Sequence, residues 1–463
     1  MNPSLPLKDN AQAIVWFRHD LRLHDHAPLR LASRAERLLA VYCLPPHWLA
    51  LGPAGVPRIG VHRLAYLGQA LGALDTSLRA LGNELMIVLA EPVQALGDIS
   101  RALGEAPIFV HAHPGWEERE AIAKLQASGV TVQAVHGGGL FDPDDLPFAL
   151  EPFPVPFTRF RKLIETAQWP SVAPLAAPTA LPPSAELPAD FYAQAREQVA
   201  ALLHSHSASA QQCSTATRSA LPYTEPAWQG SETAGLAHLA RYFSSGLVAD
   251  YKTTRNGLLG SDYSSKWSPW LAVGSLSVRE IEVQRLAYEM RLGANDGSYW
   301  LWFELLWREY FQLLMWRYGR RCFSRSGIQN QLSHSSAKAR HNPAAFAAWC
   351  QGNTGCDWVD AAMRELAASG YMGNRMRQNV ASYLIHDLAL DWRLGAAWFE
   401  HQLIDFDVAS NQGNWLYLAG AGTDPRSDRR FSPSRQAAMY DPDGAYQRYW
   451  LSERHHSDQE HMR

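Results

Sequence analysis

The chain has 463 residues, of which 47% are hydrophobic and 19% charged, and its formal net charge at pH 7 is −3. This length favours two or three domains with sizeable cores, and the nearly balanced charge excludes binding to nucleic acid through overall positive charge. Five cysteines without metal-ligand spacing favour reduced thiols over a disulfide framework, and no metal site is expected.

The first residues, MNPSLPLKDN, lack the apolar segment of a secretory signal, and no apolar run is long enough to span a bilayer. We therefore expect a cytoplasmic protein without membrane association, and we expect it to act as a monomer.

The first part of the chain alternates short apolar runs with helical patterns. The runs at 13–17, 38–44, 84–89, 108–111 and 130–135 predict buried parallel strands, and leucines from Leu64 to Leu81 mark an amphipathic helix. Alternation of this kind predicts a doubly wound parallel sheet of the flavodoxin or Rossmann type over residues 1–139. No GxGxxG follows the first strand, and Gly137, Gly138 and Gly139 indicate only a turn.

Residues 140–230 have the composition of a long connector. The proline-rich stretch 171–190 cannot form a regular helix, and the Ser- and His-rich stretch 204–220 is typical of a mobile surface loop. Only the segment FTRFRKLIE, at 157–165, predicts a helix.

Residues 231–451 show helical periodicity, and a charged tail at 452–463 is expected to be disordered. Within this part, one helix ends at Gly370, and a second, at about 375–388, carries Arg377 among apolar residues. A break at 405–407 precedes a last helix with Asn411 and Trp415. Buried charges need partners, so the pattern predicts a polar ligand inside a helical bundle.

Several long motifs carry a resemblance to a known family. The segments WVDAAMREL, SGYMGNRMRQNVAS, DWRLGAAWFE and LIDFDVASNQGNW resemble the flavin-binding core of photolyases and cryptochromes. The resemblance extends from AIVWFRHDLRLHD to YWLSE, and the stretch TRNGLLGSDYSSKWSPWLAVGSLS with the Gln378-Asn379 pair is most similar to the DASH cryptochrome branch. It implies an α/β domain, a connector and a C-terminal helical domain that binds FAD. It also implies repair of cyclobutane pyrimidine dimers, preferentially in single-stranded DNA, by light-driven electron transfer from reduced FAD.

The resemblance assigns a set of residues to the flavin. Ser264, Ser265 and Lys266 suit a pyrophosphate, Arg377 suits the polar edge of the ring, and Asn411 matches the position that faces flavin N5. A buried Arg–Asp network that only joins helices is the alternative. The complete set is Tyr251, Ser264, Ser265, Lys266, Ser268, Arg308, Asn374, Arg377, Asp405, Asp407 and Asn411.

The resemblance also assigns a substrate cleft. Glu304 would bond a flipped pyrimidine dimer, and Trp307 would stack beside it because the two residues share one helix face. Tyr417 would form the other wall. A Glu–Arg helix pair with a core tryptophan is the alternative. Residues expected to face DNA are Arg255, Arg375, Arg320 and Arg321, although a basic cluster can be only a solvated face.

Trp415 and Trp392 match the first two members of the family's tryptophan electron chain. The third would fall near Ala339, where no tryptophan occurs, and the sequence does not place Trp349 or Trp358. Glu117 lies where relatives with a folate antenna, 5,10-methenyltetrahydrofolate, carry a carboxylate, but acidic residues at a helix start are also ordinary dipole partners. Two other functions stay open, namely a blue-light signalling photoreceptor without repair activity and a light-independent nucleotide-binding protein.

Overall fold

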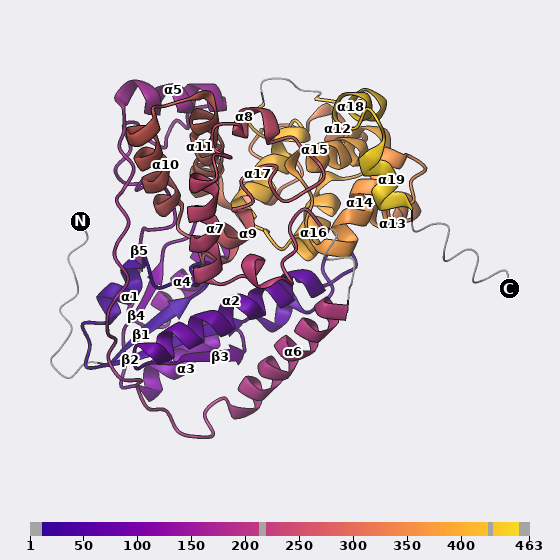
Figure 1. Cartoon of the computed structure of the whole chain (residues 1–463). Helices are drawn as coiled ribbons and strands as arrows, with labels where there is room; N and C mark the ends of the chain where they lie inside the picture. The colour runs from indigo at the N-terminus through magenta and orange to yellow at the C-terminus, as the bar shows by residue number, and fades with distance from the viewer. Residues whose placement is uncertain (1–11, 213–218, 425–428, 453–463) are drawn as a thin grey trace.

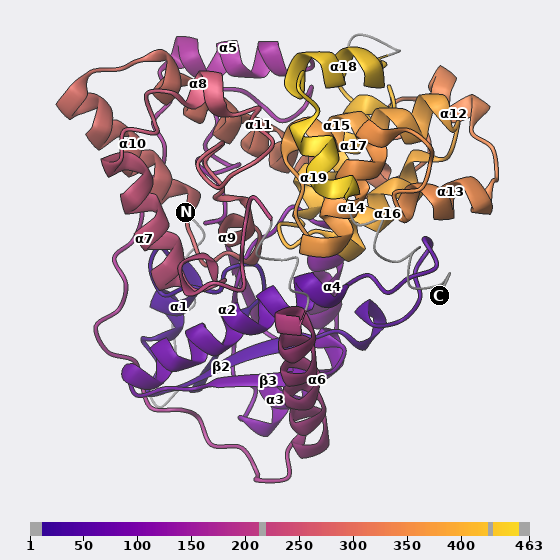
Figure 2. The same cartoon turned by 45° about the vertical axis from the view of Figure 1, so that its right-hand side comes forward.

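The computed structural model describes residues 12–212, 219–424 and 429–452, with no side-chain description at 210–212. A parallel sheet with its helices forms one part of the molecule, and a larger helical part lies above it (Figures 1 and 2). Among the helices that are described, none combines the length and apolarity that crossing a membrane requires.

The sheet has five parallel strands in the order β3-β2-β1-β4-β5. Their apolar residues alternate between two cores, so that Val15 packs on one face and Ile14 on the other. Burial on both faces explains why the strands are continuous apolar runs, and the predicted doubly wound sheet is confirmed. The strands are β1 (Gln12–Phe17), β2 (Arg37–Leu44), β3 (Leu85–Leu89), β4 (Ile108–His111) and β5 (Val132–Val135).

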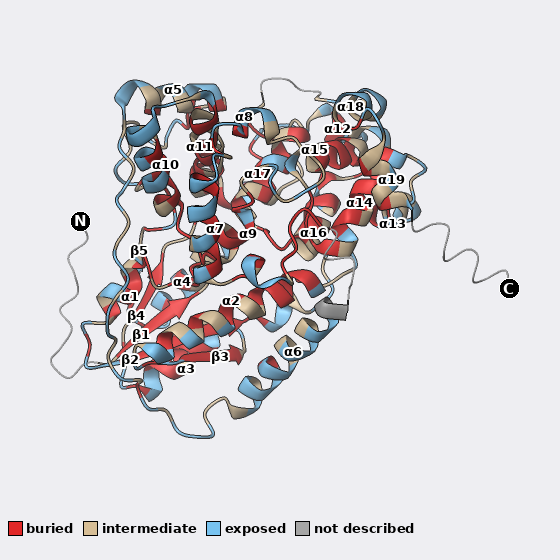
Figure 3. Cartoon of the chain, in the orientation of Figure 1, coloured by how far each residue is buried: buried red, intermediate tan, exposed pale blue. Residues whose placement is uncertain are grey.

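Helices cover both faces of this sheet, and Figure 3 shows its strands as almost entirely buried. One face carries α1 (Ala27–Ala32) and α2 (Val61–Ala80), and the other carries α3 (Pro92–Ala102) and α4 (Trp116–Ala127).

The connector contains two helices. The predicted helix is present as α5 (Phe157–Ala167), and 171–190 is irregular as expected. The expected mobile loop at 204–220 is wrong for residues 204–212, which belong to the long helix α6 (Ala193–Gln212). Val199 and Leu203 pack against the core beside α2, so tertiary contact stabilises a segment whose composition indicated a loop. Residues 213–218 lie outside the described residues.

The helical part surrounds one large core. Its longest helix, α11 (Asp296–Tyr318), begins at a capping box formed by Asn295 and Ser298. The helix expected at about 375–388 ends earlier, because α15 (Asn374–Ser382) passes into a π-helical turn at Tyr383–Asp387. The other helices are α7 (Glu232–Ser244), α8 (Tyr251–Thr254), α9 (Ser268–Val273), α10 (Val278–Leu292), α12 (His334–Lys338), α13 (Pro343–Cys350), α14 (Asp357–Ser369), α16 (Trp392–Gln402), α17 (Val408–Leu418), α18 (Pro433–Tyr440) and α19 (Ala445–Leu451). Short 3-10 turns lie at Pro46–Trp48, Pro226–Trp228 and Gly319–Phe323.

The turn after β5 joins the sheet to α11. The buried Glu309 carboxylate accepts the backbone N–H of Leu140 at 2.8 Å, and Arg308 donates to the Gly138 carbonyl at 3.1 Å. A Cβ atom on Gly139 would lie 2.4 Å from Glu309 Oε1, so this contact requires glycine. The glycine turn, 137–139, therefore positions the helix that carries Glu304 and Trp307.

Candidate functional site

An ion pair between a partly buried arginine and a buried aspartate stands at the centre of the helical part. Arg377 on α15 donates to both carboxylate oxygens of Asp405, at 2.9 and 2.7 Å, and its Nε donates to the Met372 carbonyl at 2.8 Å. Burial alone would lower the pKa of Arg377, but the Asp405 carboxylate outweighs it and raises that pKa. The pair is therefore charged, and a polar ligand can meet it without desolvating a lone charge.

The start of α17 supplies the next polar groups. The Asp407 carboxylate caps this helix by accepting the Ser410 N–H at 2.7 Å, and the Asn411 side-chain amide donates to the Ala396 carbonyl at 3.1 Å. An inner cavity of about 80 Å³ lies between α15 and α17 and brings together the predicted residues Asn374, Arg377, Asp405, Asp407 and Asn411.

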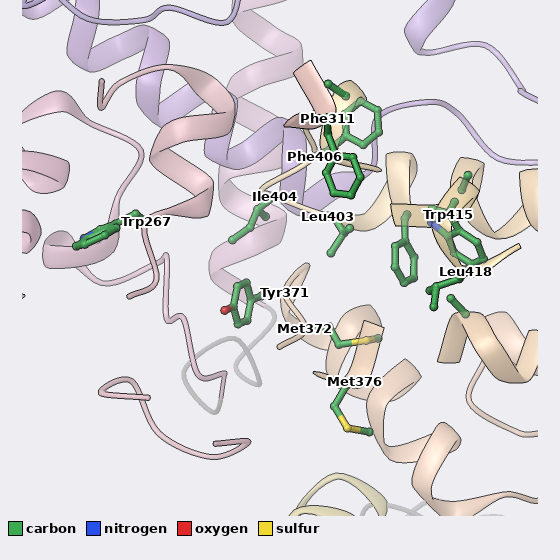
Figure 4. Close-up of a cluster of buried hydrophobic side chains, with 14 of the residues drawn as sticks. Trp267, Phe311, Tyr371, Met372, Met376, Leu403, Ile404, Phe406, Trp415 and Leu418 are labelled. Atoms are coloured by element: carbon green, nitrogen blue, oxygen red, sulfur yellow. The ribbon is translucent and has the colours of Figure 1, made fainter. Parts of the chain in front are cut away.

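Apolar side chains complete the wall of this cavity. Leu403, Phe406, Trp415 and Leu418 line it, and Figure 4 shows them in a larger buried cluster with Tyr371 and Met372. An apolar wall with a few fixed polar groups fits a flat aromatic ring that has one polar edge, which is the shape of a flavin. The sequence reasoning did not assign Asn414 to the site, although it also lines the cavity and lies three residues after Asn411.

The loop before α9 reaches the cavity only indirectly. Ser264 and Lys266 have positive φ angles of 65° and 58°, and the Lys266 ammonium lies 3.4 Å from the Tyr371 hydroxyl. This ammonium is buried beside the Tyr371 ring. The guanidinium of Arg377 also contacts that ring, 5.6 Å from its centroid. Lys266 is therefore buried beside Tyr371, and its binding to a phosphate stays a prediction.

The remaining loop residues have different settings. The Ser265 carbonyl accepts a hydrogen bond from His238 at 2.9 Å, Ser268 is the exposed first residue of α9, and Tyr251 is buried on α8. These hydroxyls do not line the inner cavity, so they could meet only a part of the ligand that extends beyond it.

Glu365 extends the charged network to the last helix. This buried carboxylate on α14 accepts a hydrogen bond of 2.5 Å from the Tyr446 hydroxyl on α19. Burial raises the pKa of Glu365 to about 7, against the opposing effects of Tyr446, Lys266 and Arg377. Burial likewise lowers the pKa of Lys266 to about 8.

Arg308 does not join this cavity. It bonds the glycine turn, and with His19, His113 and Asp407 it lines a separate small cavity between the sheet and α11. Asp407 lines both cavities, so the small cavity beside Arg308 adjoins the candidate flavin site.

The candidate substrate cleft lies along α11. Glu304 is partly buried and forms an ion pair with Arg255, and burial raises the pKa of its carboxyl despite that partner. The Trp307 ring stacks on Phe157 of α5, with centroids 3.7 Å apart and planes 12° apart. Tyr417 meets Trp307 edge-on, at 5.7 Å and 81°, so it stands beside this ring and not parallel to it.

The other basic residues have separate roles. Arg375 donates to Gln378 at 2.8 Å and lies 4.8 Å from the Tyr440 ring centroid. Arg321 donates to the Ile328 carbonyl at 2.6 Å and so holds the loop that follows, while Arg320 is exposed.

Arg429 contacts Tyr417, one of the residues predicted to bind the substrate. It donates to the Tyr417 hydroxyl at 2.6 Å and pairs with Asp424. The sequence did not reveal it, because the motif spacing gave no sign that Arg429 reaches Tyr417.

The tryptophans separate into two groups. Trp415 contacts Phe399 at 5.2 Å, and Phe399 contacts Trp349 at 6.3 Å, whereas Trp392 donates from Nε1 to the Arg325 carbonyl at 3.4 Å. Trp358 packs on Tyr446. Neither Trp349 nor Trp358 stands where a third tryptophan would follow Trp392.

Ala339 lines a cleft of about 680 Å³ between the two parts of the molecule, together with Arg325 and Arg340. Glu117, from the first turn of α4, also lines this cleft, and both its oxygens accept from Arg58 at 3.0 and 2.9 Å. Arg58 also bonds Glu400 on α16 and so spans the two parts.

Two family descriptions match the chain. "DNA photolyase" matches residues 13–182, and "FAD binding domain of DNA photolyase" matches residues 300–463. The chain therefore belongs to the photolyase and cryptochrome family of FAD flavoproteins, as the motifs predict.

Several relatives are cryptochromes of the DASH type. It is 41% identical to the Cryptochrome DASH of Synechocystis over 95% of this chain and 87% of that protein, and 42% identical to that of Gloeobacter violaceus over 95% and 85%. A solved Synechocystis cryptochrome matches with a TM-score of 0.85 at 40% identity, over 96% of this chain and 89% of that one. A class III photolyase from Agrobacterium tumefaciens matches with a TM-score of 0.76 at 27% identity, over 98% and 89%.

Proposed function

We propose that this chain is a DASH-type photolyase that uses blue light to split cyclobutane pyrimidine dimers, preferentially in single-stranded DNA. The observation that carries the proposal is the placement of Glu304 and Trp307, three residues apart on α11, in the helical part that also holds the Arg377–Asp405 cavity. When bound, reduced FAD would supply the electron that opens the dimer.

The residues of the chain bind and orient the two partners. Arg377, Asp405 and Asn411 would hold the polar edge of the flavin ring, and Trp415 would pack beside it. Glu304 would hydrogen-bond the flipped bases once they displace Arg255, and Trp307 would stack on them. A preference for single strands follows because an unpaired dimer costs less to flip.

A repair assay under blue light on single- and double-stranded oligonucleotides with one dimer tests the proposal. Repair should occur in light, not in darkness, and faster on single strands. Trp307→Ala should weaken dimer binding by roughly 1–3 kcal/mol, and Glu304→Gln should lower repair yield after binding. Glu280→Gln, a carboxylate on α10 outside the cleft, is the control.

The same assay separates the alternative function. A protein that keeps FAD and responds to light but repairs neither substrate would be a signalling photoreceptor. Unchanged repair in both cleft variants would instead show that the cleft lies elsewhere.

We also propose that a folate antenna occupies the cleft beside Glu117. Gln412 supports this, because its buried Oε1 faces the cleft without a hydrogen-bond partner among the described residues. Glu117→Gln should lower the folate that copurifies or binds on reconstitution, measured by absorbance, while Glu120→Gln on the same helix should not. Equal folate content in the two variants would remove Glu117 from the site.

The oligomeric state and location are proposals as well. Both candidate sites are built within one chain, which supports a monomer, and light scattering in solution tests it. Four cysteines, Cys43, Cys322, Cys350 and Cys356, carry free thiols, which supports a reducing compartment such as the cytoplasm.

A further inference from the structure

Helix α5 lies beside the candidate substrate cleft although it belongs to the connector. It packs on α11, and Figure 1 shows it running across the same end of the molecule as α8. Phe157, Phe160 and Ile164 recur at helical spacing and are buried, so they fix which face of α5 turns inward. Arg159 and Lys162 are three residues apart on the outward face, and both are exposed.

The inward face of α5 orients a substrate residue. Phe157 and Trp307 are parallel to within 12° and only 3.7 Å apart, so Phe157 fixes the plane of the indole. A base that stacks on Trp307 must approach the ring where Phe157, Phe311 and Tyr417 do not cover it. Phe157 is therefore a positioning residue for the ring on which the flipped base would rest.

Two aromatic rings, with an arginine at each end, connect α5 with the end of α8. Arg161 of α5 lies 5.7 Å from the Phe303 ring, Phe303 lies 4.5 Å from Trp300, and Arg255 lies 4.2 Å from Trp300. Both rings are only partly buried. Single-stranded nucleic acid is bound by this combination, in which bases stack on exposed rings and phosphates meet neighbouring cations.

The three basic side chains of α5 differ in whether they already have partners. Arg161 donates to the Tyr299 hydroxyl at 2.9 Å and lies 3.7 Å from Glu165, so it is partly neutralised. In the part of the chain that the structure describes, neither Arg159 nor Lys162 pairs with a carboxylate. These two side chains are therefore available for phosphates.

We propose that α5, with Trp300 and Phe303, forms a track for the single strand on one side of the dimer cleft. The proposal rests on the proposed function and names the surface that the flanking strand would use. Arg159 and Lys162 would contact phosphates, and Phe157 would act only through Trp307.

Binding to single-stranded oligonucleotides with and without a dimer, measured over a range of salt concentrations, tests this track. The double variant Arg159→Gln/Lys162→Gln should weaken binding to both oligonucleotides and reduce the slope of log K against log salt by about 1.4, or about 0.7 for each lost phosphate contact. The matched control is Arg30→Gln/Arg34→Gln, on α1 and just after it, which removes two exposed cations from the sheet part and should leave the slope unchanged.

Phe157→Leu keeps an apolar side chain but removes the stacked ring. It should lower affinity for the dimer-containing strand by about five-fold and leave affinity for the undamaged strand unchanged. Flavin content and the circular dichroism melt verify that each variant is folded. A wild-type salt slope in the α5 double variant would overturn the track, whereas a wild-type protein that binds no single-stranded DNA would overturn the proposed function itself.

Discussion

At the scale of single residues, the Asp405 carboxylate offsets the positive charge of the partly buried Arg377. Asp405→Ala should leave that guanidinium without its carboxylate, which costs about 3 kcal/mol or more and should sharply reduce flavin retention. Absorbance of the purified protein measures the flavin. Glu186→Ala, which removes a carboxylate from the exposed pair with Arg37, is the matched control and should keep its flavin.

Glu365 should make stability depend on pH. Its pKa of about 7 in the folded protein exceeds the ordinary value of 4.5, so its stabilising contribution is complete below pH 4.5 and is lost as the pH rises through 7. Lys266 affects stability in a different pH range. Because its pKa is lowered to about 8, it reduces stability as the pH falls from 10.5 toward 8.

The free energy of unfolding in urea at pH 5 and pH 7.5 measures this effect. The loss between the two values should be smaller in Glu365→Gln than in the wild type, and Tyr446→Phe should change it as well because it removes the hydroxyl donor. If both variants lost as much unfolding free energy as the wild type between pH 5 and pH 7.5, Glu365 would not titrate in this interval. Glu280→Gln serves as the control.

Motif spacing predicted the cavity residues Arg377, Asp405, Asp407 and Asn411, because they lie within one short stretch of the chain. It did not predict that Tyr371 separates Lys266 from Arg377, or that Tyr446 bonds Glu365. Lys266 and Tyr371, like Glu365 and Tyr446, are far apart in sequence, and the packing of α14 against α19 brings the second pair together.

At the scale of elements, apolar runs predicted the strands well because burial on both faces leaves few alternatives. Composition failed for α6, whose helix depends on Val199 and Leu203 meeting the core beside α2. The π-helical turn at Tyr383–Asp387 also escaped periodicity, since an extra residue in one turn leaves the apolar pattern nearly unchanged.

Ala339 is the C-cap of the short helix α12, at the position where the family resemblance would place the outer tryptophan of the electron chain. Trp392→Phe should impair photoreduction of oxidised FAD but leave repair by chemically reduced protein nearly intact. Ala339→Trp should accelerate photoreduction, because the added ring would occupy the cleft near Arg325, whose carbonyl already bonds Trp392.

Flavin absorbance under continuous blue light follows both variants, and Trp358→Phe is the control because that ring packs on Tyr446 instead. If FAD were photoreduced as fast in Trp392→Phe as in the wild type, electrons would have to reach it by another route. The ring contacts from Trp415 through Phe399 to Trp349 are the candidate for that route.

At the scale of the whole molecule, the glycine turn joins the sheet to α11. Gly139→Ala should push Glu309 away and cost about 1–3 kcal/mol, which thermal unfolding measures as a lower Tm. Gly138→Ala is a close control, because a Cβ there would meet nothing within 4 Å. Equal Tm values in the two variants would show that the joint accommodates an extra methyl group.

The stacking of Phe157 on Trp307 has a consequence for how this architecture can be recombined. The two matched family segments, 13–182 and 300–463, invite exchange between relatives as if each were a self-contained module. Yet the ring that orients Trp307 lies in the first segment, and Trp307 lies in the second. A chimaera joined after residue 182 would combine Phe157 of one parent with Trp307 of the other, so a crossover that keeps this stack and the joint to α11 within one parent must fall before the glycine turn.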